Sequence, residues 1–176
     1  TGMRPEEMLA IRVGNITSDG NETIISITSV LDRDGKTIKD YPKSDAGRRS
    51  LPVDDYTADT VRAWIELKSE MMRKMGLKPS MSMLVCGPEM IPRTYQSWHR
   101  DWMRFAAEAG FEGVRPYALR HTFATLNLAN GENIKTVAVL MGHASSAYTL
   151  DLYAAYVPNT GIGIGTRYMN FLRAAA

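Results

Sequence analysis

The chain has 176 residues, of which 44% are hydrophobic and 23% charged, as expected for one globular domain with its own core. The net charge of +2 permits a nucleic-acid partner without arguing for one. A single cysteine excludes an intramolecular disulfide and favours a reducing, cytoplasmic compartment. This cysteine and the three histidines are not spaced like metal ligands, so we expect neither a metal nor another cofactor. No apolar run is long enough to cross a bilayer, so we expect no membrane anchor.

The first third of the chain predicts a short helix followed by a small antiparallel sheet. The helix is expected at residues 3–10, where Pro5 suits a first turn and Glu6 and Glu7 suit its positive end. No long helix separates the strand candidates, so a parallel βαβ unit is not expected. β-branched residues and turn signals place these strands at 11–17, 22–31, 36–41 and 48–53, of which 36–41 extends the second ribbon.

The rest of the chain is predicted to be helical, which gives an α+β fold that is mostly helix with a three-stranded antiparallel sheet. Residues 80–87 read as a short buried strand or a loop. Gly-x-Gly-x-Gly at 161–165 follows a helix and lacks a Lys-Ser/Thr partner, so it favours a linker over a phosphate loop. Apolar periodicity and capping residues place the helices at 57–76, 93–110, 114–131, 133–142, 145–157 and 166–176.

Two basic surfaces are candidates for DNA contact, each with a plainer alternative. The first is a hairpin tip that carries Lys43, Arg48 and Arg49, which is either a soluble turn or a tip that enters a DNA groove. The second is the edge of helix 93–110, where Arg93 and Arg100 either face solvent or contact phosphates. The aromatic face of this helix favours core packing over base stacking, and it consists of Tyr95, Trp98, Trp102 and Phe105.

The segment 114–131 places Arg120 and His121 side by side near a helix start, against an apolar stripe of Leu119, Phe123, Leu126 and Leu128. An arginine on such a surface usually packs its aliphatic stem against the apolar residues while its charged group reaches water. Near a helix N-terminus, however, the backbone N–H groups attract anions, and a guanidinium would strengthen a phosphate site. His143 follows a glycine at a later helix break, and Tyr153 comes ten residues after it.

These residues resemble the catalytic core of the tyrosine recombinases, the phage-integrase family. Four segments match that family's motifs in order: TGMRPEEMLAIR, PKSDAGRRSLPV, LRHTFAT, and LMGH followed by Tyr153, with Met141 in place of the usual leucine. The resemblance implies a catalytic domain at 1–160 without its first helices and the upstream core-binding domain. Residues 161–176 would form a linker and a C-terminal helix, which either docks on a neighbouring protomer or packs on its own domain.

The resemblance also implies a reaction and a role for each residue. Tyr153 would attack a DNA phosphodiester to give a 3′-phosphotyrosyl bond and a free 5′-hydroxyl. Arg4 and Arg120 would hold the non-bridging oxygens, Lys43 would protonate the leaving oxygen, and His143 would position the phosphate; Glu7 would be the helix partner of Arg4. The function would be site-specific recombination of double-stranded DNA, for integration or excision of a mobile element. We expect the protein to self-assemble into a tetramer on DNA and to be a monomer or weak oligomer when free.

One position departs from the family pattern. A histidine that accepts the tyrosine proton usually stands three residues before the second arginine, where this chain has Tyr117. We expect Tyr117 to position the phosphate and not to act as a base. Tyr148 and Tyr156 are alternative nucleophiles, although their spacing from His143 fits the family less well than that of Tyr153. Two rival functions remain: DNA relaxation of the type IB topoisomerase kind, and a truncated remnant that binds DNA or a partner recombinase without cutting.

Overall fold

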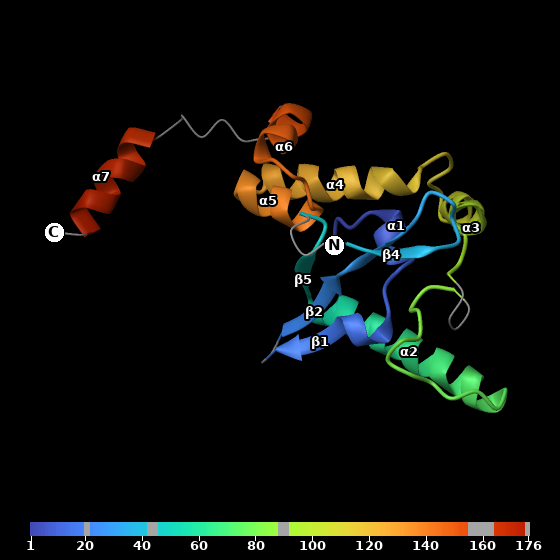
Figure 1. Ribbon diagram of the computed structural model, residues 1–176. Helices are drawn as coiled ribbons and strands as arrows, with labels where there is room; N and C mark the ends of the chain where they lie inside the picture. The colour runs from blue at the N-terminus through green and yellow to red at the C-terminus, as the bar shows by residue number, and fades with distance from the viewer. Residues whose placement is uncertain (20–21, 42–45, 88–91, 155–163, 175–176) are drawn as a thin grey trace.

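The computed structural model describes residues 1–19, 22–41, 46–87, 92–154 and 164–174, and its elements confirm the α+β fold. In Figure 1 the helices α4, α5 and α6 lie together on one side of a small sheet, and α2 lies on the other. The elements in chain order are α1 (Pro5–Met8), the 3₁₀ helix η1 (Val13–Asn15), β1 (Ile16–Asp19), β2 (Glu22–Ile27), β3 (Ser29–Leu31), β4 (Ile38–Asp40), β5 (Arg49–Val53), α2 (Asp55–Lys74), α3 (Tyr95–Glu108), α4 (Pro116–Ala129), α5 (Ile134–Met141), α6 (Ser146–Tyr153) and α7 (Ile164–Ala174).

The predicted three-stranded antiparallel sheet is present, in the order β1-β2-β5. Burial alternates along β2, so every second side chain faces the core. Ile25 pairs with Ile16 on one side and with Leu51 on the other. A cluster of buried residues forms this part of the core: Ile11, Ile25, Ile27, Leu51 and Val85.

Two strand predictions are wrong in their bounds. Residues 11–17 form a strand only from Ile16, because the N–H groups of Val13 and Gly14 bond the carbonyls of Met83 and Met81 at 2.9 and 2.8 Å. The segment 22–31 is not one strand, because the chain leaves the sheet at Thr28. Beyond that point β3 pairs with β4 in a separate two-stranded sheet. Residues 81–85 contribute one isolated bridge, Arg12 to Leu84, together with buried side chains.

Helix α4 buries only part of the apolar stripe that the sequence pattern suggested, namely Leu128 and, in part, Phe123. Leu119 and Leu126, assigned to the apolar stripe, are 51% and 57% exposed. The buried residues are instead spaced by four: Pro116, Arg120, Ala124 and Leu128. The C-terminal part of this row packs against α5 and α6 in a second core cluster, which consists of Ala124, Leu128, Val137, Met141 and Tyr153. The row therefore places the Arg120 guanidinium inside the protein rather than on its surface.

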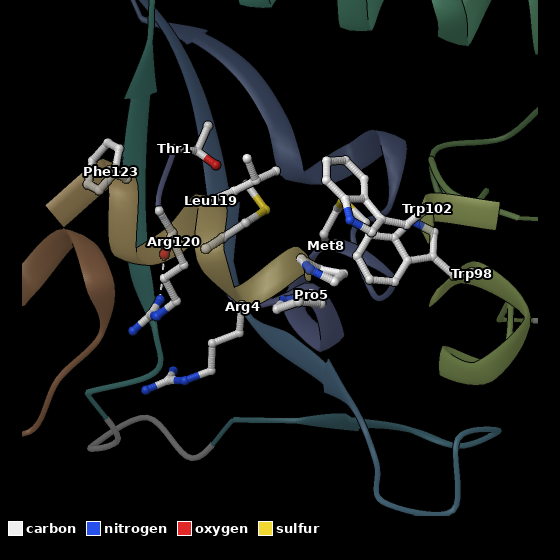
Figure 2. Close-up of a pocket in the computed structure, with 12 residues that line it drawn as sticks. Thr1, Arg4, Pro5, Met8, Trp98, Trp102, Leu119, Arg120 and Phe123 are labelled. Carbon is white, nitrogen blue, oxygen red and sulfur yellow. Dashed lines mark hydrogen bonds between the residues drawn. The ribbon is translucent and has the colours of Figure 1, made fainter. Parts of the chain in front are cut away.

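The aromatic face of α3 is packed only in part. Trp98 and Trp102 line a pocket of about 350 Å³ together with Met8 and Leu119, as Figure 2 shows. The indole N–H of Trp102 donates to the Val114 carbonyl at 2.8 Å. The two tryptophans are thus half-buried and lie outside the two core clusters described here, whereas Phe105 is 61% exposed.

Helix α7 lies apart from the other elements in Figure 1. It begins at Ile164, two residues before the predicted start, so Gly165 belongs to the helix and not to a linker. The remainder of the predicted linker and Tyr156 lie outside the described residues.

Candidate active site

Arg4 and Arg120 are far apart in the sequence, but their side chains point in the same direction. Figure 2 shows their guanidinium groups on the same side, away from Trp98 and Trp102. Arg120 is 6% exposed and donates to two backbone carbonyls, that of Gly2 and that of Met141, the latter at 2.5 Å. Arg4 donates to the Gly142 carbonyl at 2.9 Å. A pocket of about 200 Å³ lies beside these groups and is lined by Arg4, Tyr117, Arg120, His121, His143, Tyr148, Leu152 and Tyr153.

The guanidinium group of Arg120 is buried, and burial disfavours its charged form. Burial, and after it the nearby charge of Arg4, lowers the pKa of Arg120 to about 10. The guanidinium is still protonated at neutral pH. Among the described residues, Arg120 forms no ion pair with a carboxylate. A buried cation of this kind favours an anion in the adjoining pocket.

Glu7 holds Arg4 in place from inside the protein. Its carboxylate is fully buried and accepts hydrogen bonds from both terminal nitrogens of Arg49, at 2.9 and 2.7 Å. It also accepts from the Arg4 backbone N–H at 2.7 Å, the Arg4 guanidinium at 2.9 Å and the Tyr41 hydroxyl at 3.2 Å. Burial alone would raise the pKa of Glu7, but the hydrogen bonds from Arg49 and the charges of both arginines lower it.

We expect the substitution Glu7→Gln to lower the free energy of unfolding by about 3 to 5 kcal/mol, because it leaves two buried or half-buried guanidinium groups without their counter-charge. The measurement is urea unfolding at pH 7. The matched control is Glu66→Gln, which removes a solvent-exposed pair with Arg73 and should cost less than about 1 kcal/mol. Similar losses in the two variants would contradict the role assigned to Glu7.

The same carboxylate predicts a pH dependence of stability. Because the pKa of Glu7 is lower in the folded than in the unfolded protein, its contribution is complete above the unfolded pKa of a glutamate. It is lost as the pH falls through the folded pKa. The difference in stability between the parent and Glu7→Gln should therefore shrink on acidification.

His143 is presented to the pocket by the glycine before it. Gly142 ends α5 in the left-handed region, at φ 66°, and a Cβ there would lie 2.7 Å from the Arg49 guanidinium. The Nδ1 of His143 is 2.7 Å from the hydroxyl of fully buried Thr149. Burial first, then the charge of Arg120, lowers the pKa of His143 to about 4, so the ring is neutral at pH 7. When Nδ1 accepts from Thr149, the Nε2 proton remains available for a ligand oxygen.

Tyr153 belongs both to the core and to the pocket. Its side chain packs in the α4–α5–α6 cluster and is only 4% exposed. Its hydroxyl lies 2.7 Å from the Nδ1 of His121, within hydrogen-bond distance. Burial raises the pKa of Tyr153, although the charge of Arg120 acts in the opposite direction. The hydroxyl is thus placed at the pocket in its protonated form.

Tyr117 also lines the pocket, but its hydroxyl donates to the Glu6 carboxylate at 3.0 Å. Burial and the charge of Glu6 raise the pKa of Tyr117 to about 12. Its phenol therefore stays neutral over the physiological range.

The other residues predicted to contact DNA have different environments. Lys43 lies outside the described residues. Arg48 is exposed and donates to the Tyr41 carbonyl, and Arg100 is exposed on α3. Arg93 forms an ion pair with Asp101. Arg49 needs a correction: its side chain is 3% exposed and paired with Glu7, so in this structure it is part of the interior and not of a DNA-contacting tip.

The sequence alone indicates no role for His121. The Arg-His pair stands out in the sequence, but a histidine beside a predicted catalytic arginine gives no sign of its own partner. Contact with Tyr153 depends on α6 packing against α4 across 32 residues of sequence, which a linear motif does not show.

Known proteins share the sequence pattern of nearly the whole chain. The sequence model of the phage integrase family matches residues 1–159, nearly the whole chain. The chain belongs to the phage integrase family. Two curated relatives are ICEBs1 integrase from Bacillus subtilis, 24% identical over 90% of this chain, and tyrosine recombinase XerD from Agrobacterium fabrum, 30% identical over 85%. The chain spans less than half the length of these relatives, 43% and 44%.

Solved structures of this family share the fold. The Tn1549 transposon integrase, in complex with circular intermediate DNA, matches 98% of this chain and 56% of its own, with a TM-score of 0.66 and 21% identity. The catalytic domain of bacteriophage HP1 integrase matches 94% of this chain and 74% of its own, with a TM-score of 0.54 and 18% identity. Among the described residues, the helices are too short or too polar to cross a lipid bilayer.

Proposed function

We propose that this chain is the catalytic part of a site-specific recombinase. It would cleave and rejoin double-stranded DNA through a 3′-phosphotyrosyl intermediate, for integration or excision of a mobile element in the cytoplasm. The observation that supports this most is the pocket itself, where Arg4, Arg120, His143 and Tyr153 meet from four separate segments. Two cations, a neutral imidazole and a hydroxyl around one anion-sized space suit a phosphodiester.

Each group has a task in this reaction. The Tyr153 oxygen attacks the phosphorus, and the bond from phosphorus to the 5′-oxygen breaks. Arg4 and Arg120 stabilise the negative charge that gathers on the non-bridging oxygens, which two preorganised guanidinium groups match well. His143 donates from Nε2 to the phosphate, and Lys43 protonates the leaving 5′-oxygen. The reverse steps on another strand rejoin the DNA, so the bond energy is kept and no nucleotide cofactor is used.

The test is a nicked suicide substrate incubated with the full-length protein. Loss of the short fragment next to the nick traps the cleaved state, so we expect a covalent protein–DNA adduct and a free 5′-hydroxyl. The absence of an adduct with a confirmed target site would favour a DNA-binding remnant instead. Rapid relaxation of a plasmid that carries no target site would favour the topoisomerase alternative, whereas the names of the relatives above favour recombination.

Tyr117 is expected to help position the phosphate through its hydroxyl and not to take a proton. Tyr117→Phe removes that hydroxyl and its bond to Glu6, and we expect a fall in cleavage rate of roughly tenfold or less, about the value of one hydrogen bond. Single-turnover cleavage of the suicide substrate measures it, beside Tyr117→His. A rate for Tyr117→Phe equal to that of the parent would show that the hydroxyl has no part in catalysis.

The remaining proposals concern assembly. We propose that residues 1–160 form the catalytic domain and that residues 161–176 connect it to a helix that is exchanged between protomers of a tetramer on DNA. The isolated position of α7 in Figure 1 supports an exchanged helix. Arg48 and Arg100 are exposed and remain candidates for phosphate contact, together with Lys43 and, if its pair with Asp101 opens, Arg93.

A further inference from the structure

A tyrosine that attacks a phosphodiester must lose its proton. A phenol is a poor nucleophile until a base takes that proton, and burial makes this harder for Tyr153 by raising its pKa. The proposed reaction therefore needs an acceptor within hydrogen-bond reach of the Tyr153 hydroxyl, which means about 2.6 to 3.2 Å between heavy atoms.

His121 meets this geometric requirement. Its Nδ1 lies 2.7 Å from the Tyr153 oxygen, and the centroids of the two rings are 5.8 Å apart at an angle of 53°. The imidazole lies on the exposed side of α4, whereas Arg120, the residue before it in the chain, is buried. The Nε2 of a neutral ring can therefore keep its proton in contact with water while Nδ1 accepts from the tyrosine. The other titratable groups that line the same pocket are Arg4, Tyr117, Arg120, His143 and Tyr148.

Two other pocket residues are poorer acceptors. Tyr117 stands where the family usually has a histidine, but its phenol already donates to Glu6, and a neutral phenol is a weak base. His143 has its Nδ1 engaged with Thr149. Its pKa of about 4 also makes it a weak base beside a phenol.

We propose that His121 is the general base of this active site and replaces the histidine that is missing at position 117. This inference rests on the proposed function. The proton of the Tyr153 hydroxyl passes to Nδ1 of His121 as the bond from the tyrosine oxygen to phosphorus forms and the bond to the 5′-oxygen breaks. The leaving oxygen takes a different proton, from Lys43. During rejoining His121 returns the proton to the departing Tyr153 phenolate, so the residue ends as it began.

The experiment compares single-turnover cleavage of the nicked suicide substrate by the full-length parent, His121→Gln and His121→Ala across a range of pH. Gln keeps a polar contact to Tyr153 but cannot take a proton. We expect both variants to be slower by about a hundredfold at pH 7, as is common when a general base is removed. The pH profile of the variants should differ from that of the parent, because only hydroxide is left as a base in the variants and their rate should keep rising with pH.

Added imidazole gives a second test that a structural role would not affect. It should speed cleavage by His121→Ala and leave the parent unchanged, since the imidazole site is open to solvent. His99→Ala, which removes a half-buried histidine on α3 outside the pocket, should cleave like the parent. If His121→Gln cleaves as fast as the parent, or if its pH profile is unchanged, His121 is not the base. If the parent forms no adduct at all, the proposed function fails instead.

Discussion

The substitution Tyr153→Phe is expected to abolish the covalent adduct on the nicked suicide substrate while DNA binding persists. The ring of Tyr153 packs in the core cluster with Ala124, Leu128, Val137 and Met141, and phenylalanine keeps that packing. The substitution removes only the hydroxyl and its bond to His121, so the free energy of unfolding should change by about 1 kcal/mol or less. Loss of the adduct would therefore reflect chemistry and not misfolding.

Tyr148 provides the control for this result. It lines the same pocket and its ring meets His143 edge-on, with centroids 4.9 Å apart, but it is 55% exposed. Tyr148→Phe keeps that ring contact, and the adduct should still form. An adduct that survives in Tyr153→Phe and disappears in Tyr148→Phe or Tyr156→Phe would move the nucleophile to another residue.

The second large effect is expected at Arg120. Arg120→Ala should slow cleavage by about a hundred- to a thousandfold, the usual result of removing one preorganised donor from a developing negative charge. Arg120→Lys should lose much of the same activity, because an ammonium is a point charge and cannot reach the Gly2 and Met141 carbonyls and a phosphate in one plane. Single-turnover cleavage measures both variants, with thermal unfolding beside it.

Arg104→Ala is the matched control. Arg104 lies on α3 with its side chain 72% exposed and a long contact of 3.6 Å to Asp101. Its loss removes the same charge from the protein without touching the pocket, so cleavage should stay near the rate of the parent. If both arginine substitutions slow cleavage equally, the effect comes from net charge on DNA binding and not from the active site.

The residues proposed as catalytic could be selected from the sequence because their spacing is carried by short local elements. Arg120 stands near the start of α4, His143 follows the glycine that ends α5, and Tyr153 ends α6, as the helix signals indicated. The Gly142 position needs a positive φ, and this makes it visible in the sequence as a break. These residues line one pocket with Arg4. Only the family resemblance led us to expect this.

The sequence did not predict what depends on burial and on contacts between distant segments. Arg49 looked like a surface cation in a basic tip, but its partner Glu7 comes from α1, 42 residues earlier. The strand over 22–31 looked continuous because β2 and β3 have similar residues, and only pairing with β4 separates them. Leu119 and Leu126 matched an apolar stripe but are exposed, whereas Leu128 of the same stripe is buried in a row with Arg120 and Ala124.

The most direct test of the account is to identify the bond in the trapped adduct of the full-length protein. The adduct is digested with protease and nuclease, and the modified peptide is sequenced by mass spectrometry, while the released strand is labelled at its 5′ end. We predict a nucleotide joined through its 3′-phosphate to Tyr153, and a 5′-hydroxyl that accepts label without prior dephosphorylation. A phosphate joined to any other residue, or a linkage through a 5′-phosphate, would contradict it.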